Sequence, residues 1–498
     1  MSLIQVSNLT FGYEGSFDNV FENASFSMDT NWRCGFIGRN GRGKTTFLNL
    51  LLGKYAYSGT ISASVNFEYF PFEVENPDDT PLEIAENIMP DFEMWRLTRE
   101  LNLLDADPGL LYRPYSTLSY GERTKVLLSI LFIRENSFLL IDEPTNHLDE
   151  TGRALVSRYL AKKSGFLLVS HDRAFLDGCV DHILSINRSG IEVQKGNFSS
   201  WYENRQRQDA FELAQNAQLK KEIGRLKQAA RQSRAWADKV ENTKIGPHSA
   251  KVTGEADAMG GRAYIGEQSR RMQQRRKNLE RRQNAAIEEK SALLKNIEQA
   301  APLKLHQLPY HTDRLALLRD VSVCYGGAPV CRGVSFCVEQ GDRIALRGAN
   351  GTGKTSLLRL LCGEDVPHTG TVERSSRLQI SYVRQDPSGL RGDLGAYAAR
   401  YGLDERLFKA ILRKLDFARV QFEKDMADFS AGQKKKVLLA RSLCEPSHLL
   451  VWDEPLNYVD VLSRMQIEDL LLEFQPTIVF VEHDRVFCDH VATKAVML

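Results

Sequence analysis

The sequence of 498 residues predicts an α/β fold with two similar domains joined by a long helical linker. Three observations support this prediction. An ordered set of motifs occurs twice at a nearly constant offset. Apolar, β-rich runs alternate with helical patterns in residues 1–202 and 305–498, which is typical of helices flanking a largely parallel sheet. Residues 203–304 instead contain heptad-spaced apolar positions.

The first repeated motif is a glycine-rich loop between a predicted strand and a predicted helix. Gly38–Thr45 and Gly348–Thr355 both fit the pattern G-x-x-x-x-G-K-S/T. Glycine lets backbone N–H groups close around phosphate oxygens, and the helix that follows points its positive end at the anion. Each loop is therefore expected to bind the phosphates of a nucleotide. The residues expected to do so are Gly38, Asn40, Gly41, Arg42, Gly43, Lys44, Thr45 and Thr46 in the first domain, and Gly348, Asn350, Gly351, Thr352, Gly353, Lys354, Thr355 and Ser356 in the second.

An acidic pair ends an apolar run downstream of each loop. The pairs are Asp142-Glu143 and Asp453-Glu454. At a strand end, the aspartate and the loop threonine can hold Mg²⁺, and the glutamate can orient and activate an attacking water. A His-Asp-Arg triplet closes each set, at His171 and His483. Two such sets in register predict two domains that bind and hydrolyse ATP with Mg²⁺.

The central segment has the pattern of two helices. Apolar residues from Leu219 to Val240 fall near heptad a and d positions, and the pattern resumes from Met272 to Leu293. Glycine and proline between these stretches break the helix, and the tip is expected at about residues 243–264. A narrow apolar seam favours an antiparallel coiled-coil hairpin that projects outward, and a spacer folded back on the domains is the alternative.

The charge of the chain is concentrated in this segment. Residues 201–300 contain 21 Lys and Arg against 13 Asp and Glu, a net charge of +8, whereas the whole chain has +1. Such a concentration indicates contact with a polyanion, and a solvated helical face is the alternative.

A third motif lies between the loop and the acidic pair of each domain. Leu118-Ser119-Tyr120-Gly121-Glu122 and Phe429-Ser430-Ala431-Gly432-Gln433 resemble the LSGGQ signature of ATP-binding-cassette (ABC) domains. The resemblance implies that the domains pair head to tail, so that Lys44 shares an ATP site with Ser430, and Lys354 shares one with Ser119. It also implies further roles: Tyr13 and Tyr325 would stack on adenine, His171 and His483 would contact the γ-phosphate, and Asp149 and Asp460 would reach the opposite site.

The two predicted sites differ where ABC proteins place a glutamine near Mg²⁺. The stretch 380–385 supplies Gln385, but the matching stretch 67–72 ends in Phe72. We expect the site built on Lys44 to coordinate Mg²⁺ less well, and the site that contains Lys354 to turn over faster.

Two further strings narrow the resemblance to one class. Glu143–Asp149 resembles the EPTNHLD string of ABC-F proteins, and Gly196–Trp201 resembles their GNYSxY string. ABC-F membership implies entry into the exit-tRNA site of the 70S ribosome with ATP bound, and release on hydrolysis. Within that class, residues 118–126 and 454–460 together with Phe72 resemble the antibiotic-resistance group of Gram-positive bacteria, on the branch linked to lincosamides, streptogramin A and pleuromutilins.

The resemblance gives the basic linker a role. It implies that the linker extends toward the P-site tRNA and the drug pocket, where basic side chains contact rRNA and tRNA phosphates by charge and shape. The candidate RNA-binding residues are Arg270, Arg271, Arg275, Arg276, Lys277, Arg281 and Arg282, and the candidates at the tip are Lys244, His248, Lys251 and Met259.

Four functions follow from these patterns, led by ribosome protection. A housekeeping ABC-F translation factor is the second, and the ATPase subunit of a drug exporter with a separate permease is the third. A DNA-repair ABC ATPase is disfavoured, because such proteins usually carry zinc-binding clusters of cysteines. The eight cysteines here lack metal-ligand spacing and are expected to be core thiols. No apolar stretch reaches the length of a membrane helix, so we expect a cytoplasmic protein without a membrane partner. We also expect no DNA partner. The fused pair makes a monomer sufficient.

Overall fold

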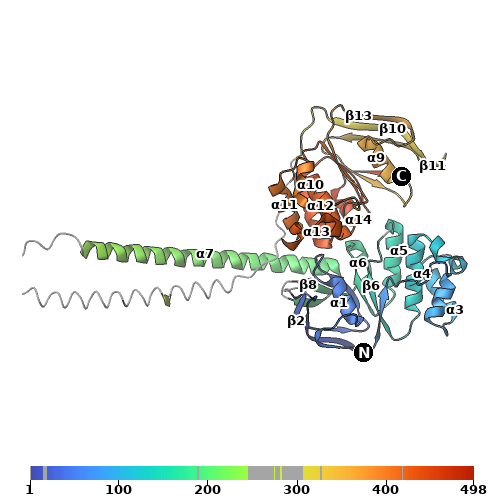
Figure 1. Ribbon diagram of the computed structural model, residues 1–498, viewed down its shortest axis with the longest axis horizontal. Coiled ribbons are helices and arrows are strands. Elements are labelled where there is room, and N and C mark those ends of the chain that lie inside the picture. The colour runs from blue at the N-terminus through green and yellow to red at the C-terminus, as the bar shows by residue number, and fades with distance from the viewer. Residues whose placement is uncertain are drawn as a thin grey trace, which may run out of the picture. The chain divides into compact units, whose positions relative to one another are not determined.

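The structure is a computed structural model that describes residues 2–14, 19–146, 148–187, 190–244, 274, 281–282, 305, 307–325, 328–417 and 419–498. The chain divides into two compact units (Figure 1). One is built from Met1–Trp201 and Ala300–Leu498, and we call these its first and second halves. The other is Tyr202–Gln299.

The first half contains two sheets. A three-stranded antiparallel sheet has the order β2-β1-β4, and a six-stranded sheet has the order β5-β6-β7-β3-β8-β9, parallel except for β8 with β9. The strands are β1 (Leu3–Phe11), β2 (Phe21–Asp29), β3 (Arg33–Ile37), β4 (Ser58–Ser62), β5 (Asn66–Phe70), β6 (Ser137–Asp142), β7 (Phe166–Val169), β8 (His182–Asn187) and β9 (Gly190–Lys195).

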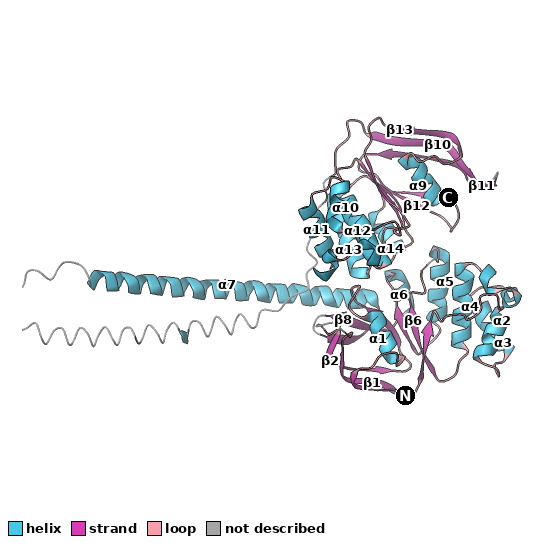
Figure 2. Ribbon diagram, in the orientation of Figure 1, coloured by secondary structure: helices cyan, strands magenta, loops and turns pink. Residues whose placement is uncertain are grey.

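Helices cover these sheets (Figure 2). One core joins Ile4 of β1, Phe47 of α1 and Leu140 of β6, so α1 packs between the two sheets. A second core joins α2, α3 and α4. The helices are α1 (Lys44–Leu51), α2 (Pro81–Ile88), α3 (Met94–Leu103), α4 (Tyr120–Phe132), α5 (Glu150–Leu160) and α6 (Arg173–Cys179), with 3₁₀ turns at Pro108–Tyr112 and Tyr115–Thr117.

The second half repeats this plan. An antiparallel sheet has the order β11-β10-β13, and a fully parallel one has the order β14-β15-β16-β12-β17. Its elements are β10 (Arg314–Tyr325), β11 (Ala328–Glu339), β12 (Arg343–Arg347), α9 (Lys354–Cys362), β13 (His368–Arg374), β14 (Ile380–Val383), α10 (Leu394–Arg400), α11 (Glu405–Lys414), α12 (Ala431–Cys444), β15 (Leu449–Asp453), α13 (Val461–Phe474), β16 (Ile478–Val481), α14 (Arg485–Val491) and β17 (Lys494–Met497), with 3₁₀ turns at Arg419–Glu423 and Met426–Asp428.

The central strands show why the sequence folds in this way. Every residue of β7, β15 and β16 is buried. Strands covered by helices on both faces need continuous apolar runs, and these are the runs that the sequence contains. The prediction of two α/β domains is therefore confirmed.

One long helix, α7 (Phe198–Lys244), begins at the end of the first half and continues into the linker unit; it is drawn in green in Figure 1. Its 47 residues correspond to a length of about 70 Å. The predicted second helix, apart from residues 274 and 281–282, and the tip beyond Lys244 lie outside the described residues. The coiled-coil hairpin and the predicted domain boundaries thus stay predictions. Within the described part of the chain, no helix has the length and apolar composition to cross a membrane.

Candidate nucleotide-binding sites

The two glycine-rich loops have the same local structure. Each follows a buried strand, β3 or β12, and leads into a helix, α1 or α9. The residue before each helix, Gly43 or Gly353, has φ of 93° or 86°, a left-handed conformation that favours glycine. Among the described residues, no side chain caps either helix, so the first backbone N–H groups are left for a ligand.

The loop lysines fold back over their own loops. Lys44 Nζ donates to the carbonyl of Gly38 at 2.7 Å, and Lys354 Nζ donates to those of Gly348 at 2.9 Å and Ala349 at 2.8 Å. Burial lowers the pKa of both lysines, while the acidic residues nearby oppose that effect. Burial makes the positive charge of each lysine unfavourable, and a bound anion such as a phosphate would stabilise that charge.

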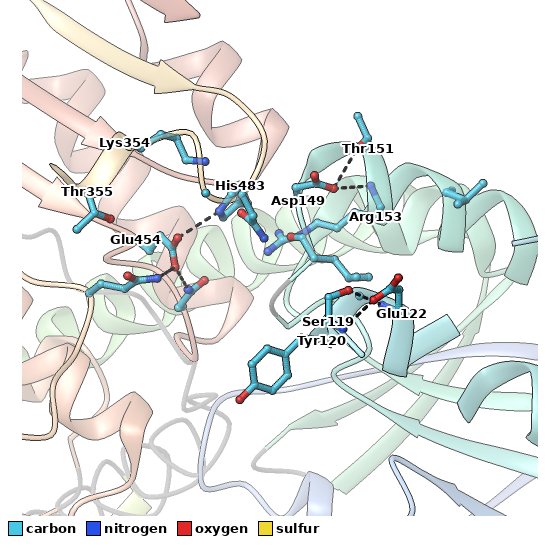
Figure 3. A pocket seen from close by; sticks show the side chains of 18 of the residues that line it. Ser119, Tyr120, Glu122, Asp149, Thr151, Arg153, Lys354, Thr355, Glu454 and His483 are labelled. Atoms are coloured by element: carbon cyan, nitrogen blue, oxygen red, sulfur yellow. Dashed lines mark hydrogen bonds and ion pairs between the residues drawn. The ribbon is translucent and has the colours of Figure 1, made fainter. Parts of the chain in front are cut away.

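A cavity of about 930 Å³ surrounds Lys354. Its lining brings side chains of both halves together, including Ser119, Asp149 and His483 (Figure 3). The predicted site residues that line it are Ser119, Gly121, Asp149, Asn350, Gly351, Gly353, Lys354, Thr355, Ser356, Gln385, Glu454 and His483.

A second cavity, of about 560 Å³, surrounds Lys44. It is built in the opposite sense, because the signature residues come from the second half. The predicted site residues that line it are Tyr13, Asn40, Gly41, Gly43, Lys44, Thr45, Thr46, Asp142, Glu143, His171, Ser430, Gly432 and Gln433. The arrangement in both cavities is the head-to-tail pairing that the resemblance implies.

Some predicted residues lie outside these linings. Tyr325 does not line the Lys354 cavity, although its hydroxyl lies 3.1 Å from Ser356 Oγ. Phe72 packs against the core of α2, α3 and α4 and is not part of the Lys44 lining. The remaining predicted loop and strand residues outside the linings are Gly38, Arg42, Gly348, Thr352 and Asp453.

Each signature serine begins a helix. Ser119 accepts a hydrogen bond from the backbone N–H of Glu122, and Ser430 accepts one from that of Gln433; in both cases the longer side chain bonds back to the serine N–H. This reciprocal cap explains why a Ser-x-x-Glu/Gln spacing occurs here. It fixes the serine at the cavity wall, where the N-terminus of α4 or α12 faces the space around the other half's lysine.

The aspartates end their strands as predicted. Asp142 Oδ2 accepts hydrogen bonds from Tyr69 at 3.0 Å and Thr45 at 3.4 Å. Asp453 is fully buried, and neither of its carboxylate oxygens has a hydrogen-bond partner of good geometry in the described residues. Burial raises the pKa of Asp453 to about 6. Thr355, Lys435 and Lys354 oppose this rise in pKa, so the carboxylate lies among groups that favour its charge. A buried carboxylate with so few well-aligned donors suits a cation, so the residues present fit Mg²⁺.

The two glutamates have different surroundings. Glu454 is held by Gln385 Nε2 at 2.9 Å, Asn457 Nδ2 at 2.6 Å and His483 Nε2 at 3.2 Å. Burial acts to raise its pKa, but the His483 hydrogen bond and charge and the Gln385 hydrogen bond outweigh burial and hold the pKa at about 2. Glu454 is therefore an ionised, oriented acceptor.

Glu143 occupies the same position in the first half with fewer partners. His171 Nε2 lies 3.4 Å from its Oε1, and that oxygen makes no hydrogen bond within the described part of the chain. Burial, followed by the charge of Asp142, raises the pKa of Glu143 to about 8. Burial also lowers the pKa of His171, with Lys44 and Arg464 adding to the effect. The surroundings in the first half thus favour the neutral form of its glutamate, whereas those in the second half favour the ionised form.

Sequence reasoning missed several residues at these sites. Asn457 holds Glu454, Arg153 lines the Lys354 cavity, and Tyr69 binds Asp142. Asn457 follows the acidic pair at a fixed distance, and Tyr69 matches Tyr382 in the parallel stretch, so both left a signal in the repeat. Arg153 also has a counterpart in the repeat, because Arg464 follows Asp460 at the distance at which Arg153 follows Asp149.

The predicted linker contacts are only partly described. Arg281 and Arg282 are exposed helical residues, and Lys244 ends α7. Arg270, Arg271, Arg275, Arg276, Lys277, His248, Lys251 and Met259 lie outside the described residues. The RNA and drug-pocket contacts stay predictions.

Comparisons with known proteins agree with this geometry. The ABC transporter family model matches residues 21–146 and 331–457. The chain is similar to the ATP-binding protein Uup of Caulobacter vibrioides, with 28% identity over 96% of this chain and 74% of Uup. It is also similar to the ribosome protection protein VmlR of Bacillus subtilis, with 25% identity over 100% of this chain and 86% of VmlR.

Two further comparisons concern translation and the fold. The energy-dependent translational throttle protein EttA of Escherichia coli is 25% identical over 95% of this chain and 88% of EttA. The archaeal ribosome recycling factor aABCE1, solved with the ribosomal stalk protein aP1, superposes with a TM-score of 0.61 and 18% identity, covering 98% of this chain and 87% of that one. Because the family model covers both halves and the relatives align over nearly the full length, the chain belongs to the ABC transporter family as an ABC-F ATP hydrolase.

Proposed function

We propose that this protein is a ribosome-binding ATPase that protects the ribosome from antibiotics of the peptidyl-transferase centre. ATP bound in both cavities holds the two halves together and favours entry into the exit-tRNA site; hydrolysis releases the protein. One observation supports this most: two cavities built from both halves occur in a chain whose halves are separated by a helix of 47 residues. VmlR, which aligns with the full length of this chain, is a ribosome protection protein.

Within this proposal, each site residue has a role. The loop residues, with Lys44 or Lys354, bind the phosphates, and the signature serine of the other half completes each site. Glu454 and Glu143 accept the proton of the attacking water, and His483 and His171 orient them. Thr45 and Asp142 in one site, and Thr355, Gln385 and Asp453 in the other, would hold Mg²⁺. The bound ion would neutralise phosphate charge.

The linker has the charge that this function needs. Residues 201–300 carry a net charge of +8, and a long basic helix suits the phosphates of rRNA and the P-site tRNA. In this proposal the tip at residues 243–264 reaches the drug pocket and causes a lincosamide, a streptogramin A or a pleuromutilin to leave.

A housekeeping translation factor is the second candidate, because EttA aligns over nearly as much of the chain as VmlR does. Such a factor would bind the ribosome and hydrolyse ATP in the same way, but it would not have to distinguish between drugs. The two candidates differ in cell-free translation with a pleuromutilin present, where only a protection protein restores synthesis.

Ribosome co-sedimentation tests the shared part. The Glu143→Gln, Glu454→Gln variant keeps both cavities but loses both proton acceptors, so it should pellet with 70S ribosomes when ATP is present and stay in the supernatant without ATP. The matched control adds Lys44→Met and Lys354→Met, which remove the phosphate-binding cations, and should not pellet under either condition. A folded, ATP-bound double variant that fails to pellet contradicts the ribosome proposal and favours an exporter subunit.

A further inference from the structure

Lys435 is a lysine in the second half with 1% of its surface exposed. It lies in α12, five residues after the signature serine Ser430. Its Nζ donates to three backbone carbonyls: those of Arg384 at 3.0 Å, Glu454 at 3.1 Å and Asp453 at 3.4 Å. An ammonium group has three donors, so these hydrogen bonds use all of them.

The three carbonyls belong to the segments that carry the reactive side chains. Arg384 directly precedes Gln385, Asp453 ends β15, and Glu454 directly follows that strand. Gln385 and Glu454 are themselves joined by a side-chain hydrogen bond of 2.9 Å. Lys435 therefore joins through the backbone the same two segments that Gln385 and Glu454 join through their side chains.

The backbone of Glu454 needs such support. Its φ is 46°, a left-handed conformation that is costly for a residue other than glycine and persists only when its surroundings hold it. A buried ammonium that donates to the carbonyls of Glu454 and its neighbour fixes the direction in which this turn points the carboxylate.

The first half lacks this device at the matching position. Thr124 lies five residues after Ser119, and its hydroxyl donates to Tyr120 O at 3.0 Å within its own helix. Glu143 has the same left-handed backbone, with φ of 49°, but its carboxylate is the less restrained of the two. The half that has a lysine five residues after its signature serine is thus the half whose glutamate carboxylate is more firmly held.

We propose that Lys435 is a positioning residue for ATP hydrolysis in the Lys354 cavity. By holding the carbonyls of Arg384, Asp453 and Glu454, it keeps the Gln385 and Glu454 side chains in line with the phosphate-binding loop. The proposal rests on the proposed role of Glu454 and is independent of the ribosome as partner.

The helix does not need Lys435 to stay docked. Near the other end of α12, Ser442 Oγ accepts hydrogen bonds from Trp452 Nε1 of β15 at 2.9 Å and from Ser381 Oγ of β14 at 3.0 Å. These bonds tie the helix to the same two strands. Removing the ammonium should therefore leave the fold in place and affect the turn.

Steady-state hydrolysis in a Glu143→Gln background, where Glu454 is the remaining acceptor, tests the proposal. Lys435→Met keeps most of the apolar stem but removes all three hydrogen bonds, so kcat should fall at least about tenfold while KM for ATP changes less than about threefold. The affinity for a fluorescent ATP analogue should stay within the same threefold. Thr124→Val, the matched change in the first half, should leave kcat within about twofold.

Two measurements separate the possible failures. Thermal unfolding shows whether Lys435→Met folds; if it does not, Lys435→Gln, which keeps a neutral donor, decides the question by the same kcat and KM. A folded variant with kcat within about twofold of its parent overturns the proposal, as does a parallel loss of kcat and ATP affinity. Adding Glu454→Gln to the same background is the reference: if hydrolysis survives that change, the proposed role of Glu454 fails, whatever Lys435 does.

Discussion

Glu143 and Glu454 show how two copies of one motif acquire different chemistry. The residues are at matching strand ends, yet Gln385, Asn457 and His483 hold the ionised form of one, while burial favours the neutral form of the other. A general base must be ionised to accept a proton from water. The local environment therefore predicts that the Lys354 cavity hydrolyses ATP faster at neutral pH.

The pH profiles of the single sites should differ. In Glu454→Gln, hydrolysis depends on Glu143, whose pKa is about 8, so the rate should rise about tenfold between about pH 7 and pH 9 as the carboxyl ionises. In Glu143→Gln, hydrolysis depends on Glu454, whose pKa of about 2 leaves it ionised throughout, so the rate should be flat. Single-turnover hydrolysis over that range is the measurement. Equal rates and superimposable profiles would contradict the asymmetry.

At the scale of elements, helix N-termini position both signatures, but the two helices differ in the space around their glycines. A Cβ on Gly432 would meet Tyr458 O at 2.5 Å and Asn40 Nδ2 at 3.3 Å, whereas a Cβ on Gly121 would meet only Leu148 Cδ2, at 3.5 Å. Tyr458 O also accepts a 2.8 Å hydrogen bond from Asn40 of the opposite half. Gly432 is thus required where the backbone passes close to the start of α12.

Gly432→Ala should consequently impair the Lys44 site more than Gly121→Ala impairs the Lys354 site. The added methyl group must displace the Tyr458 segment and with it the Asn40 hydrogen bond, so hydrolysis in a Glu454→Gln background should fall at least about tenfold. Gly121→Ala in a Glu143→Gln background makes an ordinary contact and should stay within about threefold. Comparable losses in both variants would show that the close approach to Tyr458 does not matter.

The elements also show what a sequence can predict here. The loops, acidic pairs and serine-capped helices follow from local patterns, because each is a strand end or helix start with its own residue requirements. The heptad spacing likewise predicted the helix that became α7. Lys435 and the Asn40–Tyr458 contact were not predictable, because they join segments through side-chain directions that no local period encodes.

At the scale of the whole ATPase unit, the arginines of the two His-Asp-Arg triplets make unequal contacts. Arg173 is buried, and its Nη2 lies 2.5 Å from Glu468 Oε2 of the second half. Arg485 Nε lies 3.8 Å from Glu150 Oε1 of the first half, and both side chains are about half exposed or more. The triplet of Arg173 contributes His171 to the smaller Lys44 cavity, so the buried contact belongs to that side. The triplet of Arg485 contributes His483 to the larger Lys354 cavity, so the exposed contact belongs to the other side.

This inequality suggests that the Lys44 side keeps the halves together while the Lys354 side opens to exchange nucleotide. Arg173→Ala would leave the buried Glu468 with His490 as its remaining ion-pair partner among the described residues, and should lower the free energy of unfolding by about 3 kcal/mol. Arg485→Ala removes exposed ion pairs with Glu150 and Asp489 and should cost less than about 1 kcal/mol. Urea unfolding midpoints of the two variants, compared with the parent at low and high salt, measure both effects. A larger shift for Arg485→Ala would place the firmer contact on the Lys354 side, and release of ATP hydrolysis products would then be expected from the Lys44 cavity first. Equal shifts would show that neither side holds the halves more firmly.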